Sequence, residues 1–215
     1  MGVTVDIIES LNWRYAVKKF DYGITLTNEQ IQMIIESVRM SASAFGLQPY
    51  RLIRVEDGTV REQLGEHSMG NREKVINAPV LLILAIEATA DTTLVERYIS
   101  LIAAERGMPR QDLAQMEQML NGYIGRFPSN TAYQAWARSQ AYLALGNMLT
   151  VCAVTGIDAC PMEGFDPAAY DRILELEKLG VTSVVAAVLG HRAVDDAYLK
   201  LKKVRKPMNE FLIRV

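Results

Sequence analysis

The sequence contains little cysteine and little histidine, with Cys152, Cys160, His67 and His191 the only such residues among 215. Two cysteines cannot build a disulfide framework, and neither residue type has the spacing of a metal site, so we expect no bound metal. No histidine lies near Cys160 in the sequence, which favours a buried, unreactive thiol over a nucleophile. A chain that needs no disulfides is expected in the reducing cytoplasm.

The sequence also lacks a large net charge and a targeting signal. Its 23 basic and 25 acidic residues give a net charge of −2, which argues against a nucleic-acid or membrane-surface protein. Residues 1–6 lack the basic and apolar regions of a signal peptide, and Asp6 breaks the myristoylation pattern. Ser139–Ile157 is uncharged and almost long enough to span a membrane, but its polar residues, such as Gln140 and Asn147, indicate a core or dimer helix.

Glycine-rich nucleotide signatures are missing as well. No G-x-G-x-x-G follows an expected strand and no P-loop occurs, so a nucleotide would have to bind by another route. The chain is 50% hydrophobic, which suits one full core at this length. The sequence shows no internal repeat, low-complexity tract or linker, and we therefore expect a single domain over residues 1–215.

What the sequence does contain is a set of helical periodicities and a few continuous apolar runs. Thr27 and Gln30 form a capping box before a helix that reaches about Met40. Asp166 followed by Pro167 predicts the start of a short helix. Other helices are expected at 3–11, 91–106, 109–120 and 131–156, an irregular segment at 121–130, and strands at 50–55, 79–86 and 181–189. Few strands among many helices indicate an α+β protein.

Two segments are rich in basic residues. Arg14 and Lys18 lie four residues apart near the start, and a second group occupies 200–206. Arginine can hold a phosphate dianion with a bidentate fork, so both segments together are consistent with one shared anionic ligand. Taken alone, either segment could instead be a solvated basic surface.

Two further segments could contact a flat ring. Ser41–Pro49 consists mainly of small residues, which allow close backbone approach, and Gln48 can both donate and accept hydrogen bonds. The alternative is a plain connection between a helix and a strand. Asn71 could recognise a pyrimidine edge, and Lys74 could favour negative charge on a reduced ring. The alternative for these two residues is a solvated loop pair.

Cys160–Pro167 is a candidate reactive corner. Pro161 fixes the backbone and Gly164 permits unusual dihedral angles, so N–H groups here could face a ring nitrogen that accepts hydride. Two interpretations of Glu163 are open: it is a general acid, or its side chain is solvated and only its backbone matters.

Together these segments resemble the nitroreductase family, FMN enzymes that oxidise NAD(P)H and reduce nitroaromatics or quinones. Arg14–Phe20 is similar to the family's Arg-x-Ser-x-Lys/Arg-x-Phe, and Ser41–Tyr50 to its Ser-Pro-Ser-Ser-x-Asn-x-Gln-Pro-Trp. Pro161–Asp166 is similar to Pro-Ile-Glu-Gly-Phe-Asp. The resemblance spans nearly the whole chain and is completed by Asn71, Lys74, Ala78-Pro79, Gly190–Arg192 and Lys203–Pro207. Ala16 and Gly46 depart from the pattern, replacing a serine and an asparagine.

The resemblance implies a nitroreductase-like fold, with a central, mostly antiparallel sheet surrounded by helices. It implies a homodimer with FMN at the subunit interface, a long central interface helix, and a C-terminal tail that reaches the partner subunit. The residues implied at FMN are Arg14, Tyr15, Ala16, Lys18, Ala42, Ser43, Ala44, Gly46, Gln48, Asn71, Lys74, Pro161, Met162, Glu163, Gly164, Lys203 and Arg205.

Their implied roles fall into three groups. The phosphate would be held by Arg14, Lys203 and Arg205, and the ring by Lys18, Asn71 and Lys74. Ser43 and Gln48 would reach the FMN of the other subunit. Pro161–Gly164 would flank the ring, with the Glu163 backbone N–H at N5 and no side chain certain to be catalytic.

The implied reaction is a ping-pong transfer of hydride from NAD(P)H through flavin N5 to an electron-poor acceptor. Residues 108–133 would shape the acceptor pocket, and Tyr123, Phe127 and Tyr133 are candidates either to stack on an aromatic acceptor or to pack in the core. Three alternatives are open: another reaction on the same scaffold (enone reduction, dehalogenation or flavin breakdown), a non-catalytic flavin-binding protein, or a helical protein that binds an anionic partner without a cofactor.

Overall fold

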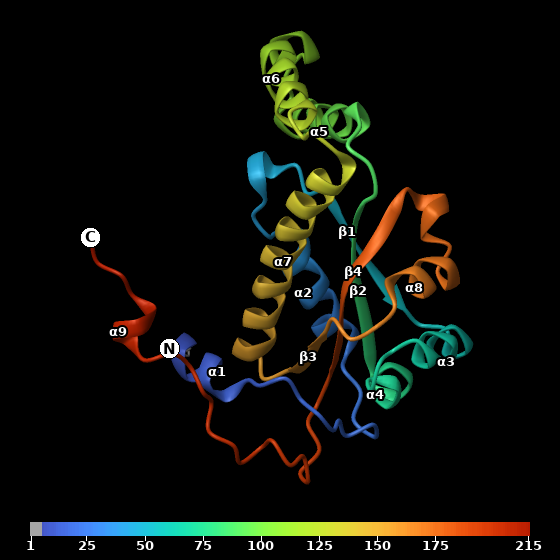
Figure 1. The fold of residues 1–215 in the computed structure, drawn as a ribbon, viewed down its shortest axis with the longest axis vertical. Coiled ribbons are helices and arrows are strands. Elements are labelled where there is room, and N and C mark those ends of the chain that lie inside the picture. Colours follow the sequence, from blue (N-terminus) through green and yellow to red (C-terminus); the bar gives the residue numbers. More distant parts are fainter. Residues whose placement is uncertain (1–5) are drawn as a thin grey trace.

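A four-stranded antiparallel sheet forms the centre of the molecule (Figure 1). The computed structural model describes residues 6–215. The strands are β1 (Tyr50–Val55), β2 (Val80–Glu87), β3 (Asp158–Met162) and β4 (Val181–Gly190), and their order is β1-β2-β4-β3. This architecture confirms the expected α+β fold with an antiparallel sheet. The strands expected at 50–55, 79–86 and 181–189 are all present.

Helices make up most of the rest of the described chain. They are α1 (Ile7–Trp13), α2 (Asn28–Arg39), α3 (Gly58–Glu66), α4 (Arg72–Asn77), α5 (Thr92–Arg106), α6 (Ala114–Gly125), α7 (Asn130–Val154), α8 (Pro167–Ile173) and α9 (Met208–Phe211). Three short 3₁₀ turns are η1 (Ala44–Gly46), η2 (Arg110–Leu113) and η3 (Leu176–Leu179). No helix in the described part of the chain is long and apolar enough to cross a membrane.

Side-chain oxygens start several of these helices. Thr27 accepts from the Gln30 amide while the Gln30 side chain accepts from the Thr27 amide, which is the expected capping box. Asp166 caps α8 ahead of Pro167, also as expected. Ser129 caps α7, and Gly156 lies just past its end with a φ of +70°.

The central strands are buried on both faces. Leu82 and Leu84 of β2 pack with α2 and α7 on one face, whereas Leu81 and Ile83 pack with α3, α4 and α8 on the other. This alternation follows from the two-residue period of a strand. Figure 1 shows α7 running along one side of the sheet, with α5 and α6 projecting past its N-terminal end.

The C-terminal tail leaves the body of the molecule and carries α9 away from it (Figure 1). Its apolar side chains face solvent in the single chain, with Phe211 72% exposed and Ile213 83% exposed. Apolar surface of this kind is typical of an interaction segment.

Several expectations from the sequence were wrong. α3, α4, β3 and α9 were not predicted, and 121–125 is the end of α6 rather than irregular chain. The helix expected at 3–11 is found at Ile7–Trp13; residues 3–5 of that expectation lie outside the described chain. β3 escaped prediction because Pro161 argues against a strand, yet it pairs with Ala187 at the sheet edge, where proline is tolerated.

Candidate functional site

Three basic residues from the two ends of the chain converge beside β3. We call Arg14, Lys203 and Arg205 the basal cation cluster. After α1 the chain runs extended along the sheet edge, where Ala16 forms a bridge with Ala159. The Lys203 ammonium donates hydrogen bonds to the Leu11 and Arg14 carbonyls, which fixes the tail across this segment. The pairing explains how residues about 190 positions apart in sequence come to share one surface.

The cluster is electrostatically unsatisfied. Burial lowers the pKa of Arg14, and the nearby positive charge of Arg205 lowers it further. Burial likewise lowers the pKa of Lys203, with Arg14 and Arg205 adding to the effect. Within residues 6–215 no carboxylate lies within 4.0 Å of any of these three cations. A group that crowds like charges in this way is suited to binding a dianion.

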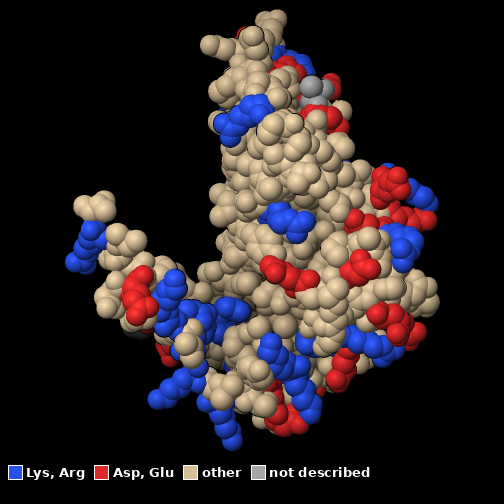
Figure 2. Space-filling model, viewed as in Figure 1, with Lys and Arg blue, Asp and Glu red and all other residues tan. Residues whose placement is uncertain are grey.

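An open cavity of about 720 Å³ adjoins the cluster. Its lining includes Tyr15, Ala16 and Arg192 from the body, and residues of the tail. Figure 2 shows Lys and Arg gathered in this part of the molecule, over α1 and the tail.

Lys18, Asn71 and Lys74 lie on the same side of the molecule as the cluster. Burial raises the pKa of the Cys160 thiol, and the positive charges of Lys74, Lys18 and Arg14 oppose that effect. Lys74, Lys18 and Arg14 are therefore all near enough to Cys160 of β3 to affect the pKa of its thiol. The Cys160 side chain itself is buried, in keeping with an unreactive thiol.

Asn71 brings α4 against the end of β3. The Asn71 Nδ2 atom donates to the Gly164 carbonyl at 3.1 Å. A Cβ atom added to Gly164 would lie 3.1 Å from that nitrogen, so the close approach favours glycine. Met162 is buried, whereas Pro161 is partly exposed. The Asn71–Gly164 hydrogen bond thus joins α4 to the backbone that follows β3.

The Glu163 side chain is exposed, but it is not simply solvated. It accepts a hydrogen bond from the phenol of Tyr142, which α7 presents toward it. Burial, with Glu163 as a further cause, raises the pKa of Tyr142 to about 12. Neither interpretation of Glu163 from the sequence included this partner. The Glu163 side chain is hydrogen-bonded to Tyr142, whether it serves as an acid or only its backbone matters.

The loop at 42–48 lies elsewhere. Its backbone is tied to α7 by the Ala44 amide, which donates to Gln140 Oε1 at 2.8 Å. The Ser43 hydroxyl accepts from the Gln48 amide at 2.9 Å, and Ala42 is exposed. Arg14, by contrast, affects the pKa of Cys152, twelve residues further along α7. At the helical rise, these two positions are roughly 18 Å apart along the axis.

The structure thus brings four of the five predicted segments together and separates the fifth. We call 14–18, 71–74, 161–164 and 203–205 the basal site: Lys203 bonds to the Arg14 carbonyl, Ala16 bridges to Ala159 of β3, and Asn71 bonds to Gly164. The segment 42–48, including Gly46 and Gln48, lies near the N-terminal end of α7 (Figure 1).

Aromatic side chains gather beside this separated loop. The Tyr123 ring lies 4.8 Å from Phe45 and 5.9 Å from Trp136, measured between centroids. Phe127 lies 5.4 Å from Trp136. Tyr133 is fully buried, so it belongs to the core and not to an exposed pocket. Tyr123 and Phe127 remain partly exposed.

Sequence reasoning assigned no supporting role to Arg192, Gln140 or Tyr142, although it named Arg192 in a family motif and Gln140 in the long helix. Arg192 donates from Nε at 2.8 Å and from a terminal nitrogen at 2.5 Å to Asp158, and its guanidinium lies 4.0 Å from the Trp13 ring and 4.6 Å from Tyr15. Each of these three residues makes a contact with a residue distant in sequence, and local patterns carry no information about such contacts.

Comparisons with known proteins identify the family and the fold. The nitroreductase family model matches residues 11–191. A protein of Staphylococcus aureus (strain bovine RF122 / ET3-1), named "Putative NAD(P)H nitroreductase SAB2397c", is 30% identical over 217 residues, covering 96% of this chain and 95% of its own.

Two solved structures share the fold at lower identity. One, from Exiguobacterium sibiricum 255-15, is described as a "putative nitroreductase in complex with FMN"; it has a TM-score of 0.82 at 18% identity and covers 100% of this chain and 99% of its own. The other is CLA-ER, an enone reductase of gut-bacterial fatty acid metabolism, with a TM-score of 0.81 at 18% identity and 100% coverage of both chains. At these identities the likeness concerns the fold alone.

Proposed function

This chain belongs to the nitroreductase family, and from that premise we propose that it is an FMN-dependent NAD(P)H oxidoreductase. Its acceptors would be nitroaromatics, quinones or similar electron-poor compounds. The observation that carries the proposal is the basal cation cluster, because three cations without carboxylate partners in the described chain fit a phosphate dianion. We place the protein in the cytoplasm, where its two free, buried cysteines would stay reduced.

The chain offers partners for each part of FMN. Arg14, Lys203 and Arg205 would hold the phosphate. Lys18, Asn71 and Lys74 would contact the ring, and the backbone N–H of Glu163 would face N5. Ala16 cannot offer the hydroxyl of the family pattern, so the phosphate would depend on the cations more heavily.

The chemistry that FMN supplies when bound is two-electron transfer from NAD(P)H to the acceptor. For a quinone the balance is NAD(P)H plus H⁺ plus quinone, giving NAD(P)⁺ and hydroquinone. The contribution of the chain is placement and electrostatics: Lys74 and Lys18 would stabilise negative charge near β3, and Gly164 leaves room for close backbone approach.

A homodimer would complete this site. In a two-fold dimer each partner contributes the same surface, so the loop at 43–48, roughly 18 Å from Cys152 along α7, could reach the basal site of the partner. Supporting this arrangement, the face over α7 is mostly uncharged in Figure 2, and Leu143 on α7 is 55% exposed. The exposed apolar tail would bury its side chains against the second subunit.

Enone reduction is the second candidate, because CLA-ER shares the fold over its whole length. The cation cluster serves either reaction equally, since it would bind the cofactor and not the acceptor. The two candidates differ only in the acceptor that completes turnover.

The experiment that tests the proposal is the visible spectrum of the purified protein, before and after anaerobic addition of NADPH or NADH. We expect an oxidised flavin spectrum that bleaches with at least one nucleotide and returns when a quinone or nitro compound is added. A flavin that stays oxidised would support a non-catalytic flavin-binding protein. A colourless protein that FMN cannot reconstitute would overturn the proposal.

A further inference from the structure

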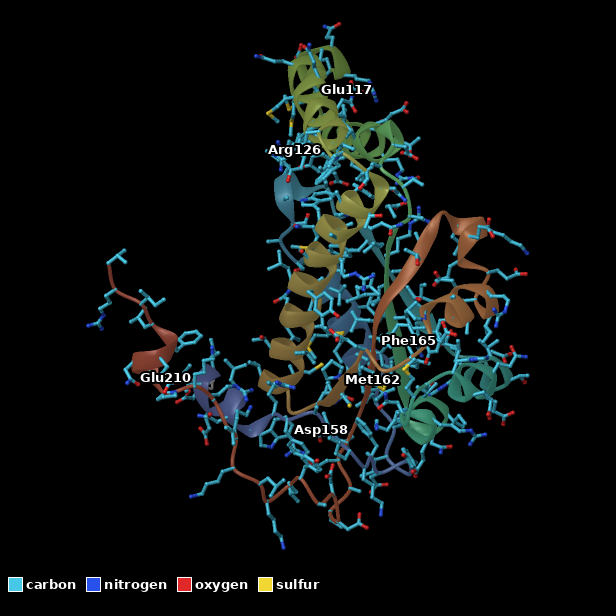
Figure 3. All side chains as sticks on the ribbon, in the orientation of Figure 1. Glu117, Arg126, Asp158, Met162, Phe165 and Glu210 are labelled. Atoms are coloured by element: carbon cyan, nitrogen blue, oxygen red, sulfur yellow. The ribbon has the colours of Figure 1, made fainter. Side chains whose placement is uncertain are left out.

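Three side chains at the end of α6 and in the 42–48 loop form an exposed surface that the cofactor assignment does not use. We call Phe45, Tyr123 and Arg126 the apical shelf. Phe45 is 47% exposed and meets the Tyr123 ring edge-on. The Arg126 guanidinium carbon lies 3.9 Å from the Tyr123 centroid. Figure 3 places Arg126 between the end of α6 and the segment that carries η1.

The loop holds Phe45 in a backbone conformation that non-glycine residues rarely adopt. Its φ is +56°, and Gln48 in the same loop has a φ of +44°. The bonds from Ala44 to Gln140 and from Gln48 to Ser43 maintain this shape. Strain of this kind is retained where the surrounding structure enforces it and is concentrated at functional sites. Here it keeps an aromatic ring turned toward solvent.

Arg126 supplies the shelf with a charge. It is exposed, and no carboxylate of residues 6–215 lies within 4.0 Å of it. Its position at the C-cap of α6 is favourable for a cation. A guanidinium can stack on a ring with one face and still bind an anionic group through its edge, because its donors lie in the plane. The contact with Tyr123 therefore leaves Arg126 able to bind an anion.

We infer that the apical shelf selects planar aromatic acceptors that carry an anionic substituent, such as a carboxylate or sulfonate. The ring of the acceptor would stack on Phe45, and its anionic group would pair with Arg126. The inference rests on the proposed function, because the shelf includes Phe45 of the 42–48 loop, which in the proposed dimer would reach the partner's basal site. Charge complementarity selects this occupant over a neutral aromatic compound, which would leave Arg126 unused.

The test is steady-state kinetics of the dimeric holoprotein with two acceptors of similar size, 4-nitrobenzoate and 4-nitrobenzyl alcohol. Arg126→Gln should raise KM for the nitrobenzoate about tenfold, the effect of losing one charged hydrogen bond. It should leave KM for the alcohol nearly unchanged. Arg126→Lys should keep part of the preference, because the charge remains while the planar fork is lost.

The matched control is Arg106→Gln, which removes an exposed cation from the C-terminal turn of the neighbouring α5 and should change neither KM. Phe45→Ala should raise KM for both compounds, since both rings would lose the stacking surface. Equal changes in the two KM values for Arg126→Gln, or no change in either, would overturn the inference.

Calorimetric titration of the oxidised holoprotein with 4-nitrobenzoate separates this inference from the proposed function. Suppose that Arg126→Gln binds 4-nitrobenzoate more weakly but NAD(P)H does not reduce the protein. That outcome would support the role of the apical shelf and reject the proposed oxidoreductase activity. Reduction of both nitro compounds with no dependence on Arg126 would uphold the oxidoreductase and reject the shelf.

Discussion

The two ends of α7 carry surfaces of opposite character. The basal cation cluster is built from segments distant in sequence, and within residues 6–215 its three cations have no carboxylate partner. The apical shelf is built by one loop and one helix end, and it offers aromatic surface with a single cation. Under the proposed function, the phosphate of the cofactor and the substituent of the acceptor would be recognised at separate ends of one helix. A substitution at one end should therefore leave the other end largely intact.

The largest effect should come from removing the support beneath the basal cluster. Asp158→Ala would leave Arg192, which is only 14% exposed, without its carboxylate partner. Because breaking a buried ion pair leaves an uncompensated charge, the free energy of unfolding should fall by about 3–5 kcal/mol. The control is Glu175→Ala, which breaks the exposed pair with Lys178 and should cost less than about 1 kcal/mol. Equilibrium unfolding in guanidinium chloride measures both. Equal losses would mean that the Arg192 pair gives the basal end no special support.

The next effect concerns cofactor retention. Arg205→Ala removes one of the three cations and should weaken FMN binding roughly 10- to 100-fold, the range for a lost charged hydrogen bond. Lys206→Ala, one residue further along, should have little effect because its side chain is not part of the cavity lining. Flavin absorbance after gel filtration distinguishes them. An Arg205→Ala protein that keeps full FMN would remove Arg205 from the phosphate site.

A smaller effect is expected at the apical end. Gly46 has a φ of +80°, and an added Cβ would lie 2.7 Å from the Tyr98 hydroxyl. Gly46→Ala should therefore cost about 1–2 kcal/mol in the free energy of unfolding. Gly122 lies inside α6 with nothing within 4 Å of an added Cβ, so Gly122→Ala should stabilise by up to about 1 kcal/mol. Thermal unfolding should show a lower melting temperature for Gly46→Ala and a higher one for Gly122→Ala. A change in the same direction for both variants would contradict the strained loop.

The smallest effect is the contribution of Tyr142 to stability at alkaline pH. Tyr142 lies between the two ends of α7. The folded protein raises the pKa of its phenol from 10.0 to about 12. A raised pKa means that the folded state favours the neutral phenol, so this stabilisation is full below pH 10 and is lost as the pH rises toward 12. Tyr142→Phe should flatten that decline. Free energies of unfolding measured across this interval would test it, and parallel curves would reject the assignment.

Local signals in the sequence were sufficient to predict three of the four strands and the starts of several helices that a side chain caps. The Thr27 box fixed the start of α2 because both of its hydrogen bonds lie within four residues. Asp57-Gly58 shows where local signals are insufficient: the pair is typical of a turn, but Asp57 accepts from the Val60 amide and starts α3. An aspartate followed by glycine favours both structures, and the packing of α3 against α4 and α8 decides between them.

The residues of the candidate site likewise fall into those that the sequence indicated and those that only the structure reveals. Resemblance to a family indicated Arg14, Lys203 and Arg205, and the structure brings them together. Gln140 and Tyr142 could not be found this way, because each acts across a gap of more than 20 residues. Arg126 was hidden for another reason: nothing in its sequence neighbourhood shows which aromatic ring it will cover.

The stretch of α7 between Gln140 and Cys152 also constrains how the gene can change. Each residue of a helix adds about 1.5 Å and turns the chain by about 100°. One inserted or deleted codon here would change both the distance and the angle between Gln140, which holds the Ala44 amide, and Cys152, whose pKa Arg14 affects. Substitutions keep both the spacing and the phase. In this segment a length change should therefore disturb the structure more than a substitution of an exposed residue would.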